Sequence, residues 1–134
     1  MKRVLKVAGV CAAVIALIAF IYICFVDTSF ATEVTLRYHD RNTKIDVTIT
    51  DKDDIRILKD LLSGLSWYDD GYPSCGFTLD TSITFSDGER SVTLCPACDM
   101  CGSARVGESN WYILINKKAL IAVVEKYGMV FPCV

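Results

Sequence analysis

Five cysteines in the second half of the chain are the residues most able to do chemistry. Three of them, Cys95, Cys98 and Cys101, lie in the segment CPACDMC and have C-x-x-C-x-x-C spacing. The other two are Cys75 and Cys133. Thiolates in such a group can bind a metal ion, form disulfides or act as a redox couple. The type of bond that they form therefore decides what the chain can do.

A β-hairpin is expected to bring four of these cysteines together. An Asp87–Gly88 step separates two segments of alternating polarity, which is a strong hairpin signal. Centring the turn on this step places Cys95 opposite position 80 and, if no bulge intervenes, Cys75 opposite position 100. We therefore predict one local cluster that joins the hairpin to the loop after it. Its members are Cys75, Cys95, Cys98 and Cys101, with Cys133 as a substitute.

The first interpretation of this cluster is a Zn²⁺ site. The CPAC segment from Cys95 to Cys98 follows a predicted strand and resembles the knuckle of zinc-ribbon proteins, whose tight turn aims two sulfurs at one tetrahedral ion. The resemblance implies that Cys101, with Cys75 or Cys133, completes the ligand set. Zinc ribbons have two separate knuckles, whereas this chain has only one, so the match is confined to this short segment.

The second interpretation is a set of structural disulfides, which small domains use in oxidising compartments. Five cysteines permit two bridges and leave one thiol over. Zinc is preferred over disulfides on one ground. Three cysteines at C-x-x-C-x-x-C spacing can all point at one ion, whereas in disulfides the middle sulfur, that of Cys98, has two competing neighbours.

Two further interpretations have less support. The CPAC segment resembles a thioredoxin-type redox motif, which needs its first cysteine at a helix N-terminus to stabilise the thiolate. The residues after Cys98 include Gly102 and Gly107 and have no helical periodicity, so no such helix is predicted. The spacing also resembles the first three ligands of a bacterial ferredoxin cluster, but the last part of that motif is missing.

The remaining residues favour a non-catalytic binding or structural module over an enzyme. His39 is the only histidine, and it lies in a predicted loop without a serine or cysteine at motif spacing. The chain offers no paired acid and base, no phosphate loop and no nucleophile with a base. The alternative function is a thiol-disulfide oxidoreductase that uses Cys95 and Cys98.

The N-terminus predicts a membrane anchor. The basic segment 1–6 precedes an uncharged run at 7–26, which as a helix is about 30 Å long and matches a bilayer core. The positive-inside rule places the basic end in the cytoplasm and the domain at 33–134 outside, after a short linker at 27–32. We therefore expect a single-pass protein of the cell membrane, with the membrane as its partner. A signal sequence cleaved after Ala31 is the alternative, and the protein would then be secreted.

The composition argues against a nucleic-acid partner. The chain has 134 residues, of which 52% are hydrophobic, and its formal net charge is −2 at pH 7. Without the three positive charges of the segment 1–6 the net charge is −5, whereas nucleic-acid binding needs a basic face.

The outer part is expected to have an α+β fold. Alternating polarity predicts strands near 33–38 and 45–50 and at 82–85 and 90–94, and a further strand is expected at 111–115. Helical spacing of leucines predicts a helix from Asp53 to Leu62 that Asp51 caps, and a second helix that Asn116 caps and Gly128 ends. The predicted order after the transmembrane helix is β-β-α-β-β-β-α, a small antiparallel sheet with two helices on one face.

As a whole the chain resembles small membrane-anchored or secreted bacterial α+β domains of unknown function. The resemblance rests on the N-terminal anchor, the ITDKDD helix start at Ile49 to Asp54, the CPACD segment and the FPCV end. It implies no activity and adds no site residue beyond the cysteines.

Overall fold

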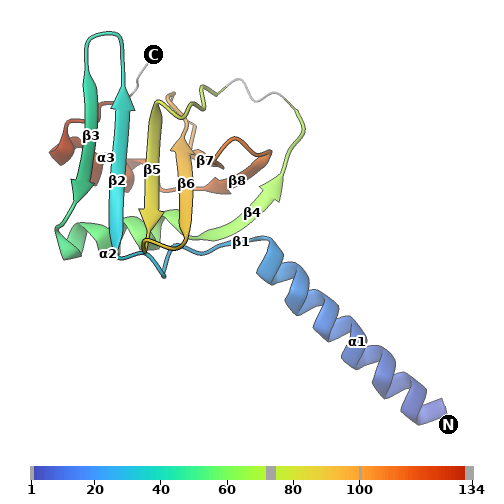
Figure 1. Cartoon of the computed structure of the whole chain (residues 1–134). Coiled ribbons are helices and arrows are strands. Elements are labelled where there is room, and N and C mark those ends of the chain that lie inside the picture. Colours follow the sequence, from blue (N-terminus) through green and yellow to red (C-terminus); the bar gives the residue numbers. More distant parts are fainter. Residues whose placement is uncertain (1, 72–74, 100, 132–134) are drawn as a thin grey trace.

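The computed structural model describes residues 2–71, 75–99 and 101–131, and on the first helix it describes the side chains of residues 6–20. The helices are α1 (Lys2–Ile23), α2 (Lys52–Leu62) and α3 (Lys117–Val124), which continues into the 3₁₀ turn η1 (Glu125–Tyr127). The strands are β1 (Phe25–Val26), β2 (Glu33–His39), β3 (Lys44–Ile49), β4 (Gly64–Tyr68), β5 (Thr81–Ser86), β6 (Ser91–Pro96), β7 (Ser103–Val106) and β8 (Trp111–Leu114). All eight strands form one antiparallel sheet in the order β1-β4-β8-β7-β6-β5-β2-β3 (Figure 1).

The predicted fold class, a small sheet after a transmembrane helix, is wrong. The order β-β-α-β-β-β-α leaves out β4 and β7 as well as β1, so the sheet is larger than expected. Neither β4 nor β7 alternates between buried and exposed residues as a half-buried strand does. Both strands pair with β8, which lies between them, so neighbouring strands determine their conformation.

The uncharged N-terminal run is divided between a helix and the sheet. α1 ends at Ile23, and the last two residues of the run, Phe25 and Val26, form β1 and pair with Leu65 and Gly64 of β4. The backbone N–H of Ser66 also donates to the carbonyl of Cys24 over 2.6 Å. The helical part of the run is therefore confined to residues 7–23.

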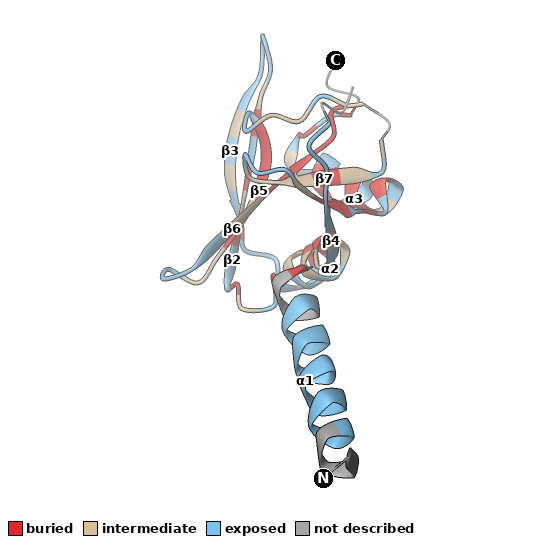
Figure 2. Ribbon diagram, turned by 90° about the vertical axis from the view of Figure 1, so that its right-hand side faces the viewer, coloured by how far each residue is buried: buried red, intermediate tan, exposed pale blue. Residues whose placement is uncertain are grey.

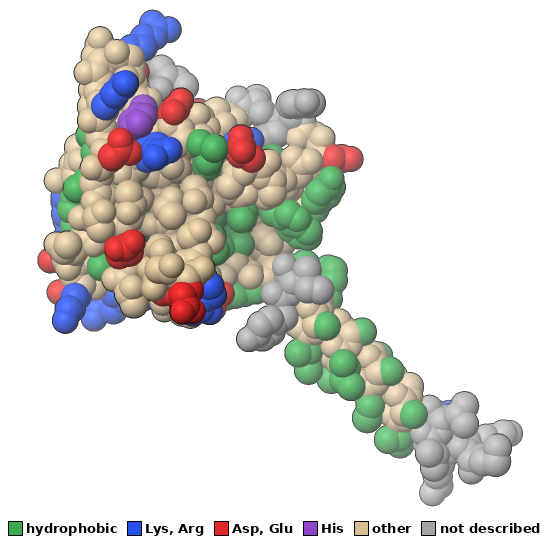
Figure 3. All heavy atoms as spheres, viewed as in Figure 1, with side chains coloured by type: hydrophobic (Ala, Val, Ile, Leu, Met, Phe, Trp, Pro, Cys, Tyr) green, Lys and Arg blue, Asp and Glu red, His purple; other side chains and the backbone are tan. Residues whose placement is uncertain are grey.

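In the part of the chain that the structure describes, no helix combines the length and the apolar character needed to cross a membrane. The predictions that depend on such a helix are therefore wrong: the anchor at 7–26, the single-pass topology, the membrane as partner and the location at the cell membrane. α1 extends away from the sheet (Figure 1), and apolar side chains are exposed along its described length (Figure 3).

The core lies inside the curve of the sheet. Alternate residues of β2, Val34, Leu36 and Tyr38, are buried there, as period-two alternation predicts. Leu58 of α2 and Leu120 of α3 are fully buried in the same cluster. Figure 2 shows α2 and α3 on the same side of β2, β5 and β6, so the two helices fill the hollow of the curved sheet.

An aspartate that begins α2 also joins the two helices. Asp51 caps α2 by accepting hydrogen bonds from the backbone N–H groups of Asp53 and Asp54. The carboxylate of Asp54 accepts from Lys126 Nζ over 2.7 Å and from the hydroxyl of Tyr127 over 2.8 Å. These contacts hold the pKa of Asp54 below its ordinary value of 3.8, the Lys126 hydrogen bond being the largest cause. Helix capping and ion pairing thus account for this acidic segment.

We predict that Asp54→Ala lowers the free energy of unfolding by about 2 kcal/mol at neutral pH, because it removes two hydrogen bonds to a carboxylate that is only 8% exposed. Asp54 has a lower pKa in the folded state than in the unfolded state. Its stabilisation is therefore complete above the unfolded pKa and is lost as the pH falls through the folded pKa. Urea denaturation from neutral pH to about pH 2 should show the wild type approaching the variant.

Asp53→Ala is the matched control for this change. Asp53 is in the same turn and pairs with Arg56 over 3.0 Å, but its side chain is 78% exposed. Its replacement should change stability by no more than about 0.5 kcal/mol. Equal losses in the two variants would show that the contacts of Asp54 with Lys126 and Tyr127 contribute nothing specific.

Candidate functional site

Cys75 and Cys101 of the predicted group form a disulfide with each other, with their Cα atoms 6.5 Å apart. Cys75 belongs to the segment between β4 and β5, whose described residues 69–71 and 75–80 we call the outer loop. Because β8, β7 and β6 lie between β4 and β5 in the sheet, this loop passes three strands before it reaches β5 (Figure 1). The disulfide ties it to the segment between β6 and β7.

The hairpin register differs from the prediction by two residues. Ser86 pairs with Ser91 and Ile83 with Leu94, and the backbone N–H of Asp87 donates to the carbonyl of Arg90. Gly88, with φ +91°, is the first central residue of the turn, where a type II′ turn favours glycine. A shift of two residues keeps every side chain on its expected face.

The cysteines are brought together by contacts outside the β5–β6 ladder. Beyond Leu94, Cys95 and Pro96 pair with β7. The backbone N–H of Cys98 then donates to the carbonyl of Gly76 in the outer loop over 2.8 Å. Phe77 of the outer loop also contacts Tyr112 of β8, with ring centroids 5.3 Å apart.

A small group of possible metal ligands surrounds the disulfide. The sulfurs of Cys75 and Cys101 and a carboxylate oxygen of Asp99 all lie within 4.8 Å of one another, and all three residues are half-buried. Asp99 Oδ1 also accepts a hydrogen bond from the backbone N–H of Cys101 over 2.8 Å. The three side chains could hold a metal, but Cys75 and Cys101 are bonded to each other, and zinc binds thiolates rather than disulfide sulfurs.

A buried lysine fixes the segment that carries these residues. Lys117, at the start of α3, is only 7% exposed, and its ammonium group donates to the carbonyls of Ala97 and Asp99. Lys117 Nζ also lies 4.6 Å from the centroid of the Phe131 ring. Burial lowers the pKa of Lys117, and the nearby charge of Asp99 acts in the opposite direction. The Lys117 side chain therefore helps to fix the path of residues 97–99, together with the hydrogen bond from Cys98 to Gly76.

Cys95 has a free thiol and lies outside the ligand group. It is fully buried in β6, opposite Arg105 of β7, and its sulfur is 3.7 Å from the carbonyl oxygen of Gly107. Burial raises the pKa of Cys95 despite the neighbouring guanidinium of Arg105. The thiol form is therefore favoured, which makes Cys95 a poor nucleophile.

Cys98 is disulfide-bonded and buried, and its sulfur lies 3.5 Å from the hydroxyl oxygen of Thr81. It does not belong to the group formed by Cys75, Asp99 and Cys101. Cys133, the predicted substitute, lies outside the described residues. The structure thus bonds Cys75 to Cys101, two members of the predicted four-cysteine cluster, while Cys95 and Cys98 have separate surroundings.

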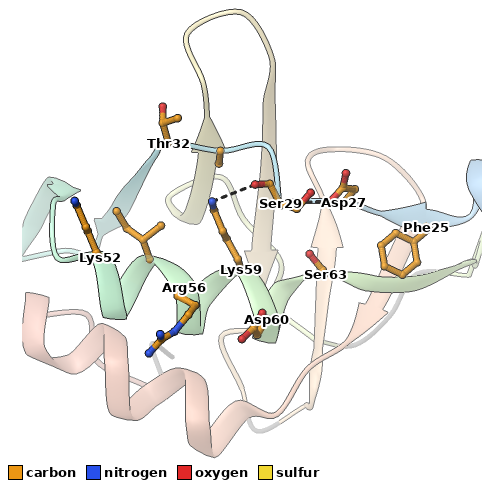
Figure 4. Close-up of a pocket in the computed structure, with 11 residues that line it drawn as sticks. Phe25, Asp27, Ser29, Thr32, Lys52, Arg56, Lys59, Asp60 and Ser63 are labelled. Carbon is orange, nitrogen blue, oxygen red and sulfur yellow. Dashed lines mark hydrogen bonds between the residues drawn. The ribbon is translucent and has the colours of Figure 1, made fainter.

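A cleft beside α2 contains a second set of functional side chains. It has a volume of about 760 Å³ and lies between α2 and the segment 25–32. Its lining includes Lys52, Arg56 and Lys59, which recur at helical spacing on α2. Figure 4 shows Lys52 and Lys59 pointing toward the segment 25–32, whereas Arg56 and Asp60, which also line the cleft, point away from that segment.

Polar contacts order one wall of this cleft. Lys59 Nζ donates to the carbonyl of Ser29 over 3.1 Å. The carboxylate of Asp27 accepts from the backbone N–H of Ser29 over 2.8 Å, and hydrogen bonds from Ser29 lower the pKa of Asp27. Phe25 and Ile55 contribute apolar surface to the same cleft. The cleft therefore combines cationic groups, of which Lys59 is held by Ser29, and two carboxylates with an apolar wall.

Sequence reasoning missed Lys117 and the lysines of the cleft, although signals were present. Lys117 precedes Leu120 and Val124 by three and seven residues, so it lies on the buried face of its helix. Lys52 and Lys59 are similarly on one face of α2. Asp99 has no such signal, because it approaches Cys75 only through tertiary contacts between its segment and the outer loop, among them the disulfide and the hydrogen bond from Cys98 to Gly76.

Comparison with known proteins identifies no relative of this chain. No family model matches it, and neither the curated proteins nor the solved structures contain a match.

Proposed function

We propose that the chain is a non-catalytic binding module. Its frame is the curved sheet, with the outer loop fixed by the Cys75–Cys101 disulfide, and its binding surface is the cleft beside α2. The observation that carries the proposal is the placement of Lys52 and Lys59 on the side of α2 that faces the segment 25–32.

The chemistry of the cleft favours a small anion with an apolar part. Lysine ammonium groups bind phosphate and carboxylate oxygens, and hydrogen bonds between charged groups are the strongest kind. Two carboxylates, those of Asp27 and Asp60, also line the cleft, but three cationic side chains on α2 outnumber them, so the lining carries an excess of positive charge. Phe25 and Ile55 offer contact to an apolar chain. A volume of about 760 Å³ lies within the usual range for small-molecule sites.

We predict saturable binding of hexyl phosphate in calorimetric titrations, with weaker binding of inorganic phosphate and of hexanol, because each of these makes only part of the contacts. Lys52→Gln should weaken the binding of hexyl phosphate about tenfold, as expected for the loss of one charge-assisted hydrogen bond.

Lys44→Gln is the matched control. It removes the same charge from the exposed start of β3, away from the cleft lining, and should leave the affinity unchanged. Equal weakening by both replacements would mean that net charge alone attracts the ligand, and the proposed site would be wrong.

The competing function, thiol-disulfide exchange at Cys95 and Cys98, can be tested directly. We predict that the purified protein does not catalyse reduction of insulin by dithiothreitol and that Cys95→Ser leaves the background rate unchanged. A buried thiol with a raised pKa yields little thiolate, the attacking form. Turnover that disappears in Cys95→Ser would overturn the proposal of a non-catalytic module.

Zn²⁺ at the cysteines is a second role that one observation favours. Two sulfurs and a carboxylate oxygen within 4.8 Å of one another are ligand types that zinc accepts. We propose Zn²⁺ as the ion for Cys75, Asp99 and Cys101 when both sulfurs are thiolates, with water as a fourth ligand. Zinc analysis of the protein before and after reduction tests this role.

A further inference from the structure

We infer that the Cys75–Cys101 disulfide gates the metal site, so that the oxidised protein is bridged covalently and the reduced protein binds Zn²⁺ through Cys75, Asp99 and Cys101. This inference rests on the zinc role proposed above and adds its regulation. It is independent of the cleft beside α2.

The geometry suits both the disulfide bond and the zinc–sulfur bonds without a large rearrangement. The Cα atoms of Cys75 and Cys101 are 6.5 Å apart, within the range for disulfides. A zinc ion with two Zn–S bonds of about 2.3 Å keeps its two sulfurs less than about 4.6 Å apart. The carboxylate of Asp99 is already within 4.8 Å of both sulfurs. The two states therefore require only local movement of the cysteine side chains.

The backbone that carries the ligands is held independently of the disulfide. Lys117 binds the carbonyls of Ala97 and Asp99, and Asp99 accepts from the N–H of Cys101. On the other side of the site, the carbonyl of Gly76 accepts from the N–H of Cys98. These contacts remain when the S–S bond breaks, so the three ligands stay close to one another.

A reductant can reach the disulfide from solvent. Cys75 lines a polar cleft of about 310 Å³, together with Arg105 and Tyr112. A small dithiol gives two electrons to the S–S bond, which breaks to leave two protein thiols while the dithiol closes to its own disulfide. Zn²⁺ then replaces the two thiol protons, which pass to solvent, and two Zn–S bonds form. The same two sulfurs cannot take part in both states at once.

The test is a Co²⁺ titration of the full chain, with Co²⁺ as a spectroscopic substitute for Zn²⁺. One sample is oxidised, and the other is reduced with dithiothreitol and desalted under argon. We expect a sulfur-to-cobalt charge-transfer band that saturates at one equivalent in the reduced sample only, and that added Zn²⁺ removes. Near-ultraviolet circular dichroism checks that the reduced protein keeps its tertiary structure.

Variants identify the ligands. Cys75→Ser and Cys101→Ser should abolish the band, and Asp99→Asn should weaken Co²⁺ binding at least tenfold, whereas Asp80→Asn, an exposed control, should not. Cys95→Ser and Cys98→Ser should retain the band, because neither residue belongs to the ligand group.

The possible results of these experiments distinguish a failure of the zinc role, of the gating and of the ligand assignment. A folded reduced protein that binds no Co²⁺ would overturn the zinc role and the gating together. Equal binding by oxidised and reduced protein would overturn the gating alone. Loss of the band in Cys98→Ser would overturn the ligand assignment. None of these results affects the binding of hexyl phosphate.

Discussion

Replacing both Cys75 and Cys101 with serine is expected to lower the free energy of unfolding by about 3.5 kcal/mol. The disulfide joins positions 26 residues apart, and the chain-entropy model gives this loss for a loop of that length. The double replacement is preferred over either single one, because a lone thiol can exchange with other cysteines. Urea denaturation of the oxidised wild type and the double variant measures the difference.

The loss is expected to be concentrated in the outer loop. The amide of Cys98, which donates to Gly76, should exchange faster in the double variant, whereas amides of the β2–β5 ladder should lose protection only through the lower global stability. Cys11→Ser removes an exposed free thiol on α1 and should change neither quantity. Unchanged stability and unchanged exchange at Cys98 in the double variant would show that the outer loop does not need the bridge.

Lys117→Met is expected to destabilise the protein by about 2 to 3 kcal/mol. Methionine has a similar length, but it removes the ammonium group that lies over the Phe131 ring and leaves the carbonyls of Ala97 and Asp99 without the donor that Lys117 provides. Lys118→Met, at the exposed next position, is the matched control and should stay within about 0.5 kcal/mol of the wild type. A loss of the same size in both variants would refute the role of Lys117 as a clamp.

The pH dependence gives an independent signature of the same residue. Burial lowers the pKa of Lys117 in the folded state below its ordinary value of 10.5, so the unfolded chain binds this proton more tightly. Its contribution to stability therefore increases as the pH rises from the folded pKa toward 10.5, and this increase should be absent in Lys117→Met. The difference between the wild type and Lys117→Met isolates this trend, because the raised pKa values of Cys95 and Tyr127, which give the opposite trend, affect both proteins.

Local patterns in the sequence were sufficient to predict those elements whose stabilising contacts lie within the element itself. Asp51 and Asn116 cap the helices that follow them, since capping needs only a side-chain oxygen within three residues of a free N–H. The alternation of Val34, Leu36 and Tyr38 places them on the buried face of β2. In each case the signal and its physical cause lie within a few residues of each other.

Strands whose conformation depends on pairing with neighbouring strands could not be predicted from local patterns. β4 and β7 have weak alternation, and their conformation comes from the ladders with β8 on both sides. The uncharged run 7–26 has the length of a membrane span, but pairing of Phe25 and Val26 with β4 removes its end from the helix. Long-range pairing competes with local preference here and prevails.

The cysteines of the candidate site show the same difference between what local patterns predict and what tertiary contacts decide. The sequence by itself predicted that Cys75 lies near the CPACDMC segment by extending the hairpin register, whereas the contacts that bring Cys75 there lie outside the β5–β6 ladder. Only the tertiary structure decided which sulfurs meet. Cys95 is held in the β6–β7 ladder beside Arg105, whereas Cys101 lies after the strand ends, where the outer loop brings Cys75 within bonding distance. Spacing along the chain limits which residues can meet, but the sheet order and the Lys117 clamp set the distances between their sulfurs.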